Sequence, residues 1–214
     1  MDRVGKKSII FDDENISLKE SLNIIIIVMI LSSIFGFIYE EIFYRIDLGY
    51  FVKRGSTYGP WIPIYFFGGG LITLISYRYR KNPLIVFLIN CFVTGILEYG
   101  TGYVLNEFFG IRLWDYNTEI WNFGNINGYI CLRSIVFFGI SSLFLVYLIL
   151  PNVKKLSEKI SEKKMSIISY GLLILFIFDV IIHFMRSVLT QNKNLRRNKI
   201  EKKTKKRKPD NNIR

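Results

Sequence analysis

Histidine and cysteine are scarce in this sequence of 214 residues, which contains one histidine, His183, and two cysteines, Cys91 and Cys131. Both cysteines lie in apolar stretches, and neither belongs to a pattern with metal-ligand spacing. A disulfide-stabilised scaffold is therefore excluded, and so is a zinc site built from histidine and cysteine. We expect the protein to bind no metal and no cofactor.

Several catalytic motifs are absent as well. The sequence contains no Gly-x-x-x-x-Gly-Lys-Ser/Thr loop, which in ATPases binds the nucleotide phosphates. It also lacks the Gly-x-Ser-x-Gly turn of serine hydrolases and the His-Glu-x-x-His pair of zinc proteases. This chain is therefore not expected to hydrolyse ATP, and an enzymatic role is not indicated by any of these motifs.

Acidic residues are outnumbered: 17 Asp and Glu face 29 Lys and Arg, for a formal net charge of +12. Residues 191–214 account for most of the excess, because they contain 11 Lys and Arg and two acids. This composition predicts that the tail 188–214 is disordered or contacts an anionic membrane surface. We expect no nucleic acid as a partner, since the tail has no aromatic residues among its charges.

Apolar runs dominate the rest of the sequence, and none shows the polar face that a soluble helix needs. A bilayer is crossed by about 20 apolar residues in a helix. The sequence thus predicts an all-α polytopic membrane protein with about five transmembrane helices and the lipid bilayer as its surroundings. The integral domain 21–187 follows a polar N-terminal segment, 1–20, and contains predicted spans at 21–42, 60–77, 83–106, 130–150 and 165–187.

Two prolines and the first run refine this prediction. Pro60 suits the first turn of the second helix, where its missing N–H leaves no bond unmade. Pro151 is expected to end the fourth helix.

The first run follows twenty mostly polar residues and has no small-residue cleavage site after it. We therefore expect it to be an uncleaved anchor.

The distribution of Lys and Arg gives conflicting signals on orientation. Five spans place the two termini on opposite sides, and the loops on the N-terminal side are richer in Lys and Arg than the other loops. The basic tail then lies on the charge-poor side. Because anionic lipids attract a polybasic segment, we expect a cytoplasmic tail and leave the side of the N-terminus open. In either case the loops after spans one and three share a side.

The residues that could carry chemistry gather on that shared side. Glu98 lies about 11 Å inside the end of span three, and Arg133 about 5 Å inside the start of span four. A charge at this depth is costly and needs a partner or water. Glu98 and Arg133 are expected to form an ion pair, which either fixes helix packing or lines a polar cavity. The candidate cavity residues are Glu40, Arg54, Tyr58, Tyr65, Glu98, Trp114, Asp115, Tyr116, Asn122 and Arg133.

Weaker candidates lie elsewhere. Asp179 and His183 are four residues apart and share a face of span five, where they relay protons or simply pack. Near the interface, Glu40 and Arg54 can be explained by solvation alone. The triplet Gly68-Gly69-Gly70 in span two favours a close helix approach over a break in the helix.

The sequence resembles the bacterial family of putative ABC-transporter type IV proteins, also called putative ABC transporter permeases. The resemblance runs from about Gly36 to Pro151, and Ser56, Thr57 and Phe66 depart from its usual pattern. It rests on the following motifs in order: Gly36-Phe37-Ile38-Tyr39-Glu40, Arg54-Gly55, Tyr58-Gly59-Pro60, Pro63-Ile64-Tyr65, Gly68, Glu98-Tyr99, Thr101-Gly102, Leu113-Trp114-Asp115-Tyr116, Asn122, Gly128 and Ile130-Cys131-Leu132.

The resemblance implies a multi-pass protein of the bacterial cytoplasmic membrane that acts as a permease-like component of a transport system. A separate ATPase or another membrane subunit would then be its partner. Two other hypotheses stay open: a membrane-embedded enzyme acting on a lipid head group, and a non-catalytic membrane or envelope factor. The resemblance names no substrate and assigns no site residues.

Overall fold

A computed structural model describes residues 11, 16–52, 54–55 and 57–207, with side chains as far as residue 190. Helices account for most of these residues, and none of them forms a β-strand, which confirms the all-α prediction. Six α-helices follow one another along the chain: α1 (Leu18–Leu48), α2 (Pro63–Ser76), α3 (Pro83–Phe109), α4 (Leu132–Phe144), α5 (Leu150–Lys159) and α6 (Glu162–Arg207).

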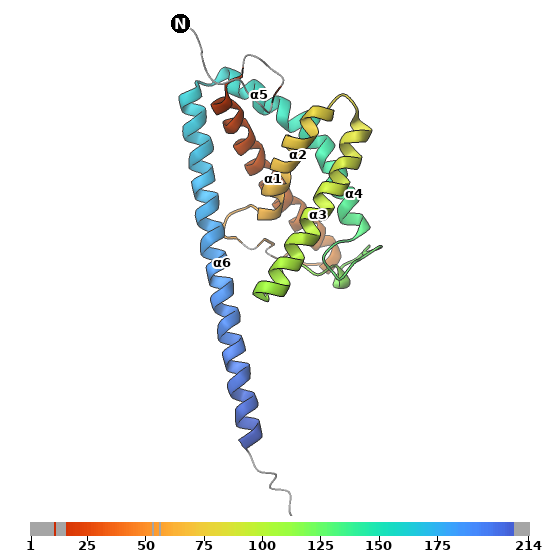
Figure 1. Ribbon diagram of the computed structural model, residues 1–214, viewed down its shortest axis with the longest axis vertical. Coiled ribbons are helices and arrows are strands. Elements are labelled where there is room, and N and C mark those ends of the chain that lie inside the picture. The colour runs from red at the N-terminus through yellow and green to blue at the C-terminus, as the bar shows by residue number, and fades with distance from the viewer. Residues whose placement is uncertain (1–10, 12–15, 53, 56, 208–214) are drawn as a thin grey trace, which may run out of the picture.

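Four helical segments are long and apolar enough to cross a membrane, so the chain has the architecture of a polytopic membrane protein. They are Leu18–Leu48, Pro83–Phe109, Leu132–Lys159 and Glu162–Thr190. The second predicted span differs, because α2 has only 14 residues. The described residues that precede it, 49–52, 54–55 and 57–62, form no helix, and they lie between the end of α1 and the start of α2 (Figure 1).

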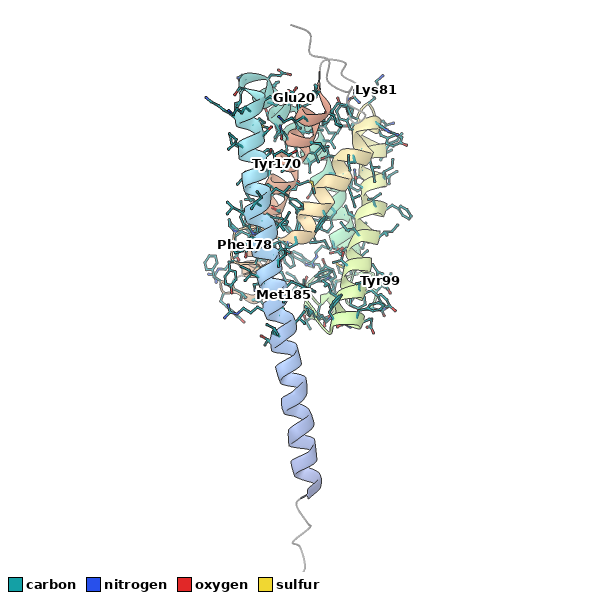
Figure 2. All side chains as sticks on the ribbon, turned by 60° about the vertical axis from the view of Figure 1, so that its left-hand side comes forward. Glu20, Lys81, Tyr99, Tyr170, Phe178 and Met185 are labelled. Carbon is teal, nitrogen blue, oxygen red and sulfur yellow. The ribbon has the colours of Figure 1, made fainter. Side chains whose placement is uncertain are left out.

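The helical segments run alternately up and down between two ends of the bundle, with α4 and α5 running in the same direction as one segment (Figure 1). Glu20 of α1 and the turn at Lys81 mark one end, while Tyr99 of α3 and Met185 of α6 lie toward the other (Figure 2). The segments 49–62 and 110–131 both reach this second end, which we call the loop end. The loops after the first and third runs therefore lie at the same end of the bundle.

Helix α2 begins at Pro63 rather than at Pro60. Pro63 occupies the first turn, the position where a proline costs no hydrogen bond. Ahead of it, the backbone N–H of Ile62 donates to the carbonyl of Ser33 on α1, 3.1 Å away. Gly69 lies so close to α1 that a Cβ there would be 2.3 Å from Oγ of Ser32. The glycine triplet therefore serves close packing, as predicted.

The fourth span does not end at Pro151, contrary to our expectation. A π-helical turn, Leu145–Ile149, joins α4 to α5, and Pro151 lies in the first turn of α5. Such a turn changes the bonding pattern of the backbone, so the missing N–H of Pro151 does not stop the helix. Leu150 and Val153 are buried in the core, and α5 packs beside α1.

The last span also extends further than predicted. Helix α6 continues to Arg207 and projects beyond the other helices (Figure 1). Most of the tail, for which disorder was expected, is therefore helical, while residues 208–214 lie outside the described part of the chain. Lys, Arg and Glu are good helix formers, and an existing helix is extended without a new nucleation step.

Polar side chains fasten α6 to α1 near the end opposite the loops. The amide of Asn23 donates to Oγ of Ser166 at 2.9 Å and accepts from Oγ of Ser169 at 2.8 Å. Asn23 and Ser169 are fully buried. Hydrogen bonds of this kind hold membrane helices together where apolar burial gives no preference between protein and lipid.

The Asn23→Ala substitution is expected to destabilise the bundle by about 1 kcal/mol, the usual size of an interhelical hydrogen bond in a membrane protein. Unfolding in mixed micelles, followed by circular dichroism as the denaturing detergent is raised, measures this change. Asn152→Ala is the matched control, because Asn152 is exposed and bonds only within its own helix. Equal stability of the two variants contradicts the prediction.

Candidate functional site

The long segment 110–131 folds into a compact hairpin-like loop at the loop end. Gly110 ends α3 with φ +66°, a conformation that glycine adopts without strain. Asp115 then accepts hydrogen bonds from the backbone N–H of Asn117 at 3.0 Å and from Nη2 of Arg112 at 2.9 Å. The carboxylate of Asp115 therefore stabilises the loop itself, and it does not line either cavity described below.

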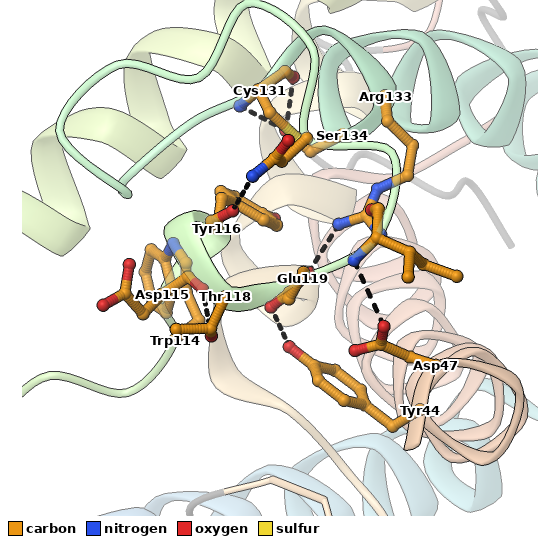
Figure 3. Close-up of polar contacts among 12 residues, drawn as sticks. Tyr44, Asp47, Trp114, Asp115, Tyr116, Thr118, Glu119, Cys131, Arg133 and Ser134 are labelled. Carbon is orange, nitrogen blue, oxygen red and sulfur yellow. Dashed lines mark hydrogen bonds and ion pairs between the residues drawn. The ribbon is translucent and has the colours of Figure 1, made fainter. Parts of the chain in front are cut away.

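Glu119 joins this loop to two helices (Figure 3). Oε1 of Glu119 accepts a hydrogen bond from the hydroxyl of Tyr44 on α1. Oε2 pairs with Nη2 of Arg133 on α4 at 2.6 Å. Next to it, the N–H of Ile120 donates to Asp47 of α1 at 3.1 Å. Loop, α1 and α4 are thus connected through one buried carboxylate.

The ion pair expected between Glu98 and Arg133 is not formed. Arg133 pairs with Glu119 instead, and its guanidinium lies over the ring of Phe43, 4.0 Å from the centroid. This carboxylate belongs to the loop 110–131, and the sequence does not indicate how that loop is folded. Because Phe43 belongs to α1, this places the Arg133 side chain on the side of α4 that faces α1.

Glu98 is buried and accepts hydrogen bonds from two hydroxyl groups. Oε2 accepts from Oγ of Ser134 at 2.8 Å, and Oε1 accepts from the hydroxyl of Tyr116. Burial, and next the nearby carboxyl of Glu98, raise the pKa of Tyr116 well above its usual value. Tyr116 therefore keeps its proton and acts as the donor. Asn122 in turn donates to the carbonyl of Tyr116 at 2.9 Å and holds this part of the loop.

Arg54 lies beside α1. Its Nε is 3.4 Å from Oε2 of Glu40, and its guanidinium lies 3.5 Å from the centroid of the Tyr44 ring. The backbone N–H of Arg54 donates to Glu41 at 2.7 Å. The side chains of Arg54 and Glu40 are each only about one-fifth exposed. The two residues thus form a half-buried pair, which solvation alone does not explain.

Asp179 of α6 holds the segment before α2. Its carboxylate accepts from the backbone N–H of Tyr58 at 2.9 Å, from that of Gly59 at 2.7 Å and from Nε1 of Trp61 at 2.8 Å. One turn further, the ring of His183 packs against the ring of Tyr58. Asp179 and His183 share a face of α6, as predicted, and both face the segment 57–61.

Two neighbouring cavities lie among these residues, and Glu40, Ile64 and Trp114 line both. The smaller has a volume of about 40 Å³ and is lined by Tyr39, Glu40, Phe43, Tyr44, Ile64, Tyr65, Glu98, Trp114, Tyr116, Glu119, Arg133, Ser134, Phe137 and Phe138. The larger has about 350 Å³ and is lined by Glu40, Arg54, Gly55, Ile62, Pro63, Ile64, Phe67, Leu97, Thr101, Leu105, Arg112, Leu113, Trp114 and His183.

Most of the sequence-predicted residues line one or both cavities. Four of them, Asp115, Tyr58, Asn122 and Asp179, line neither cavity, and their hydrogen bonds hold the loops in place instead. The sequence did not indicate that Glu119 and Arg112 are cavity residues. Glu119 is one of three acids in the polar segment 107–129, and this was the only available signal, since its partners come from distant parts of the sequence.

One family model matches the chain, and its description is "Putative ABC-transporter type IV". The match covers residues 27–184, which is well over half of the sequence and includes both cavities. The chain therefore belongs to this family. No curated protein and no solved structure matches it.

Proposed function

We propose that this member of the family is the membrane-embedded, substrate-contacting component of a transport system, with ATP hydrolysis on a separate subunit. The larger cavity carries the proposal, because it brings Glu40 and Arg54 together with an apolar wall inside a bundle of membrane-spanning length. A concave site with a few convergent polar groups is the usual form of a ligand site. The family description and the absence of a phosphate loop agree with a separate ATPase.

The buried cluster beside the cavity supports a role in moving a substrate. Glu98, Glu119 and Arg133 come from three different segments, so a shift of the loop relative to α3 or α4 changes their hydrogen bonds. Nε of Arg133 is buried and has no hydrogen-bond partner among the described residues. The unused donor gives this network a hydrogen bond to make in a second arrangement, and alternating access of a site requires two such arrangements.

The proposed location is the bacterial cytoplasmic membrane, with the loop end and the C-terminal tail on the cytoplasmic side. Residues 188–207 of the basic tail form the last part of α6, which projects beyond the loop end (Figure 1). Each Lys or Arg near an anionic cytoplasmic leaflet contributes about 1 kcal/mol. This attraction favours a cytoplasmic tail over the orientation indicated by the short loops at the other end.

The Glu98→Gln substitution tests the transport proposal. Membrane vesicles with and without the chain are incubated with a small-molecule extract of the same cells, with and without ATP, and their contents are measured by mass spectrometry. We expect at least one solute to accumulate only with the chain and with ATP, and Glu98→Gln to reduce this to background, because an amide donates where Glu98 only accepts.

Glu158→Gln is the matched control, since Glu158 is exposed on α5 at the opposite end of the bundle. It should leave accumulation unchanged. If Glu98→Gln inserts normally and still supports full accumulation, Glu98 has no part in the mechanism. Formation of a new product without ATP or a gradient identifies instead an enzyme acting on a lipid head group. If no solute depends on the chain, the transport proposal is wrong.

A further inference from the structure

We propose that the larger cavity binds an amphipathic anion, namely a membrane lipid with a phosphate-bearing head group. This inference names the substrate class of the site and rests on the proposed function for what happens after binding. The binding itself depends only on the charges and the apolar wall of the cavity, so it can be tested separately.

The charge of the cavity favours an anion. Arg54, Arg112 and His183 reach it from three separate segments, and among the described residues Glu40 is the one acid on its wall. Arg54 is paired with Glu40, and Arg112 with Asp115, whose carboxylate lies off the wall, so on the wall itself two guanidinium groups face one carboxylate. The cavity thus complements a ligand that carries at least one negative charge.

Both arginines have guanidinium N–H groups that could donate hydrogen bonds to a ligand. The side chain of Arg54 uses Nε for Glu40, and its two Nη atoms make no hydrogen bond to any described residue. Arg112 uses Nη2 for Asp115 and for the carbonyl of Asn127, and its Nη1 has no such bond within the described part of the chain. A guanidinium group has the fork geometry that matches a phosphate.

The remaining wall is apolar and lies along membrane-spanning helices. Leu97, Thr101 and Leu105 follow one face of α3 over about 12 Å, at 1.5 Å per residue. Ile62 and Phe67 face them from the segment of α2, and the Phe67 side chain is half exposed. A small hydrophilic phosphate leaves this wall in contact with water. An acyl chain covers the wall and removes its apolar surface from water, which is favourable. The apolar wall therefore favours a lipid over a free phosphate compound.

Of the helices that line the cavity, α3 and α6 contact each other only sparsely. One contact between them is edge-to-face, between the rings of Phe109 on α3 and Phe184 on α6, whose centroids are 5.4 Å apart. Aromatic side chains at this position can separate without breaking hydrogen bonds. The gap between α3 and α6 is therefore the proposed path by which a lipid enters from the bilayer.

Lipid binding by the purified full chain tests the inference. The protein is delipidated in neutral detergent and titrated with phosphatidylglycerol or with zwitterionic phosphatidylcholine, and bound lipid is counted by native mass spectrometry. We expect phosphatidylglycerol to bind more tightly, and Arg54→Gln to weaken it about tenfold or more, as expected for a lost charge-assisted hydrogen bond. Thr101→Trp should weaken it as well by filling the cavity from its uncharged side.

Lys155→Gln is the control, because Lys155 is exposed on α5, far from the cavity. Equal binding of the two lipids, or equal loss in Arg54→Gln and Lys155→Gln, overturns the inference. Displacement of the lipid by inorganic phosphate at equal concentration also overturns it, because the apolar wall then contributes nothing. Loss of lipid selectivity with intact ATP-dependent accumulation refutes only this inference, whereas selective binding without accumulation refutes only the transport proposal.

Discussion

Replacing Asp179 with alanine should release the segment 57–61 from α6 and destabilise the bundle by about 3 kcal/mol or more. The substitution leaves three donors without an acceptor: two backbone N–H groups and Nε1 of Trp61. A donor left unpaired away from water costs about 1–3 kcal/mol, and because these three bonds are partly buried, each should contribute near the lower end of that range. Asp179 itself is only 9% exposed, so water does not readily replace the carboxylate.

Unfolding in mixed micelles, followed by tryptophan fluorescence, measures the effect of Asp179→Ala. The emission of Trp61 should shift to longer wavelength in the folded variant, because its indole loses a partner that keeps it against α6. Thr190→Ala is the control, since Thr190 is exposed on the same helix and bonds only to Arg186 within it. A stability equal to that of the control shows that Asp179 does not hold the segment.

Replacing Arg133 with methionine should cost about 3–5 kcal/mol, because it leaves the carboxylate of Glu119 buried without its cation. Glu119 is 8% exposed, and Arg133 pairs with it at 2.6 Å. Adding Glu119→Gln to Arg133→Met should restore much of the lost stability, since no uncompensated charge then remains. This rescue distinguishes a charge effect from a loss of packing volume.

Arg112→Gln is the matched control for Arg133→Met. Arg112 lies at the same loop end, and the side chains of its ion pair with Asp115 are each about one-third exposed. Its loss should therefore lower the free energy of unfolding by less than about 1 kcal/mol. Denaturation in mixed micelles compares these three variants with the unsubstituted protein at equal expression. If Arg133→Met costs no more than Arg112→Gln, or if the double variant is less stable than Arg133→Met, the pair with Glu119 does not join the loop to α4.

The helices could be predicted from the sequence because hydropathy acts over short stretches of chain. The long apolar runs place α1, α3, α4 and α6, and the alternation of runs and loops places both motif-bearing loops at one end. Hydropathy could not predict the length of α2. Its start depends on the contact of Ile62 with Ser33 of α1, a tertiary contact that no local pattern indicates.

The partners of the charged residues could not be predicted in the same way. Glu98 and Arg133 were placed correctly at the same end, but Arg133 could reach either Glu98 or a carboxylate of the loop. The choice depends on the path of the loop, where Trp121 and Asn127 adopt positive φ angles that few residues favour. Similarly, no local pattern marks Asp179 as the acceptor for backbone groups 120 residues away.

The arrangement of the loop end is tested most directly by cysteine labelling in whole cells. Single cysteines are placed at Thr118, Thr190 and Lys81, all exposed positions, in a chain whose Cys91 and Cys131 are replaced by serine. A membrane-impermeant maleimide should label the cysteine at 81 in intact cells, and those at 118 and 190 only after permeabilisation. Labelling of 118 together with 81, and apart from 190, would contradict a single site built from both loops and α6.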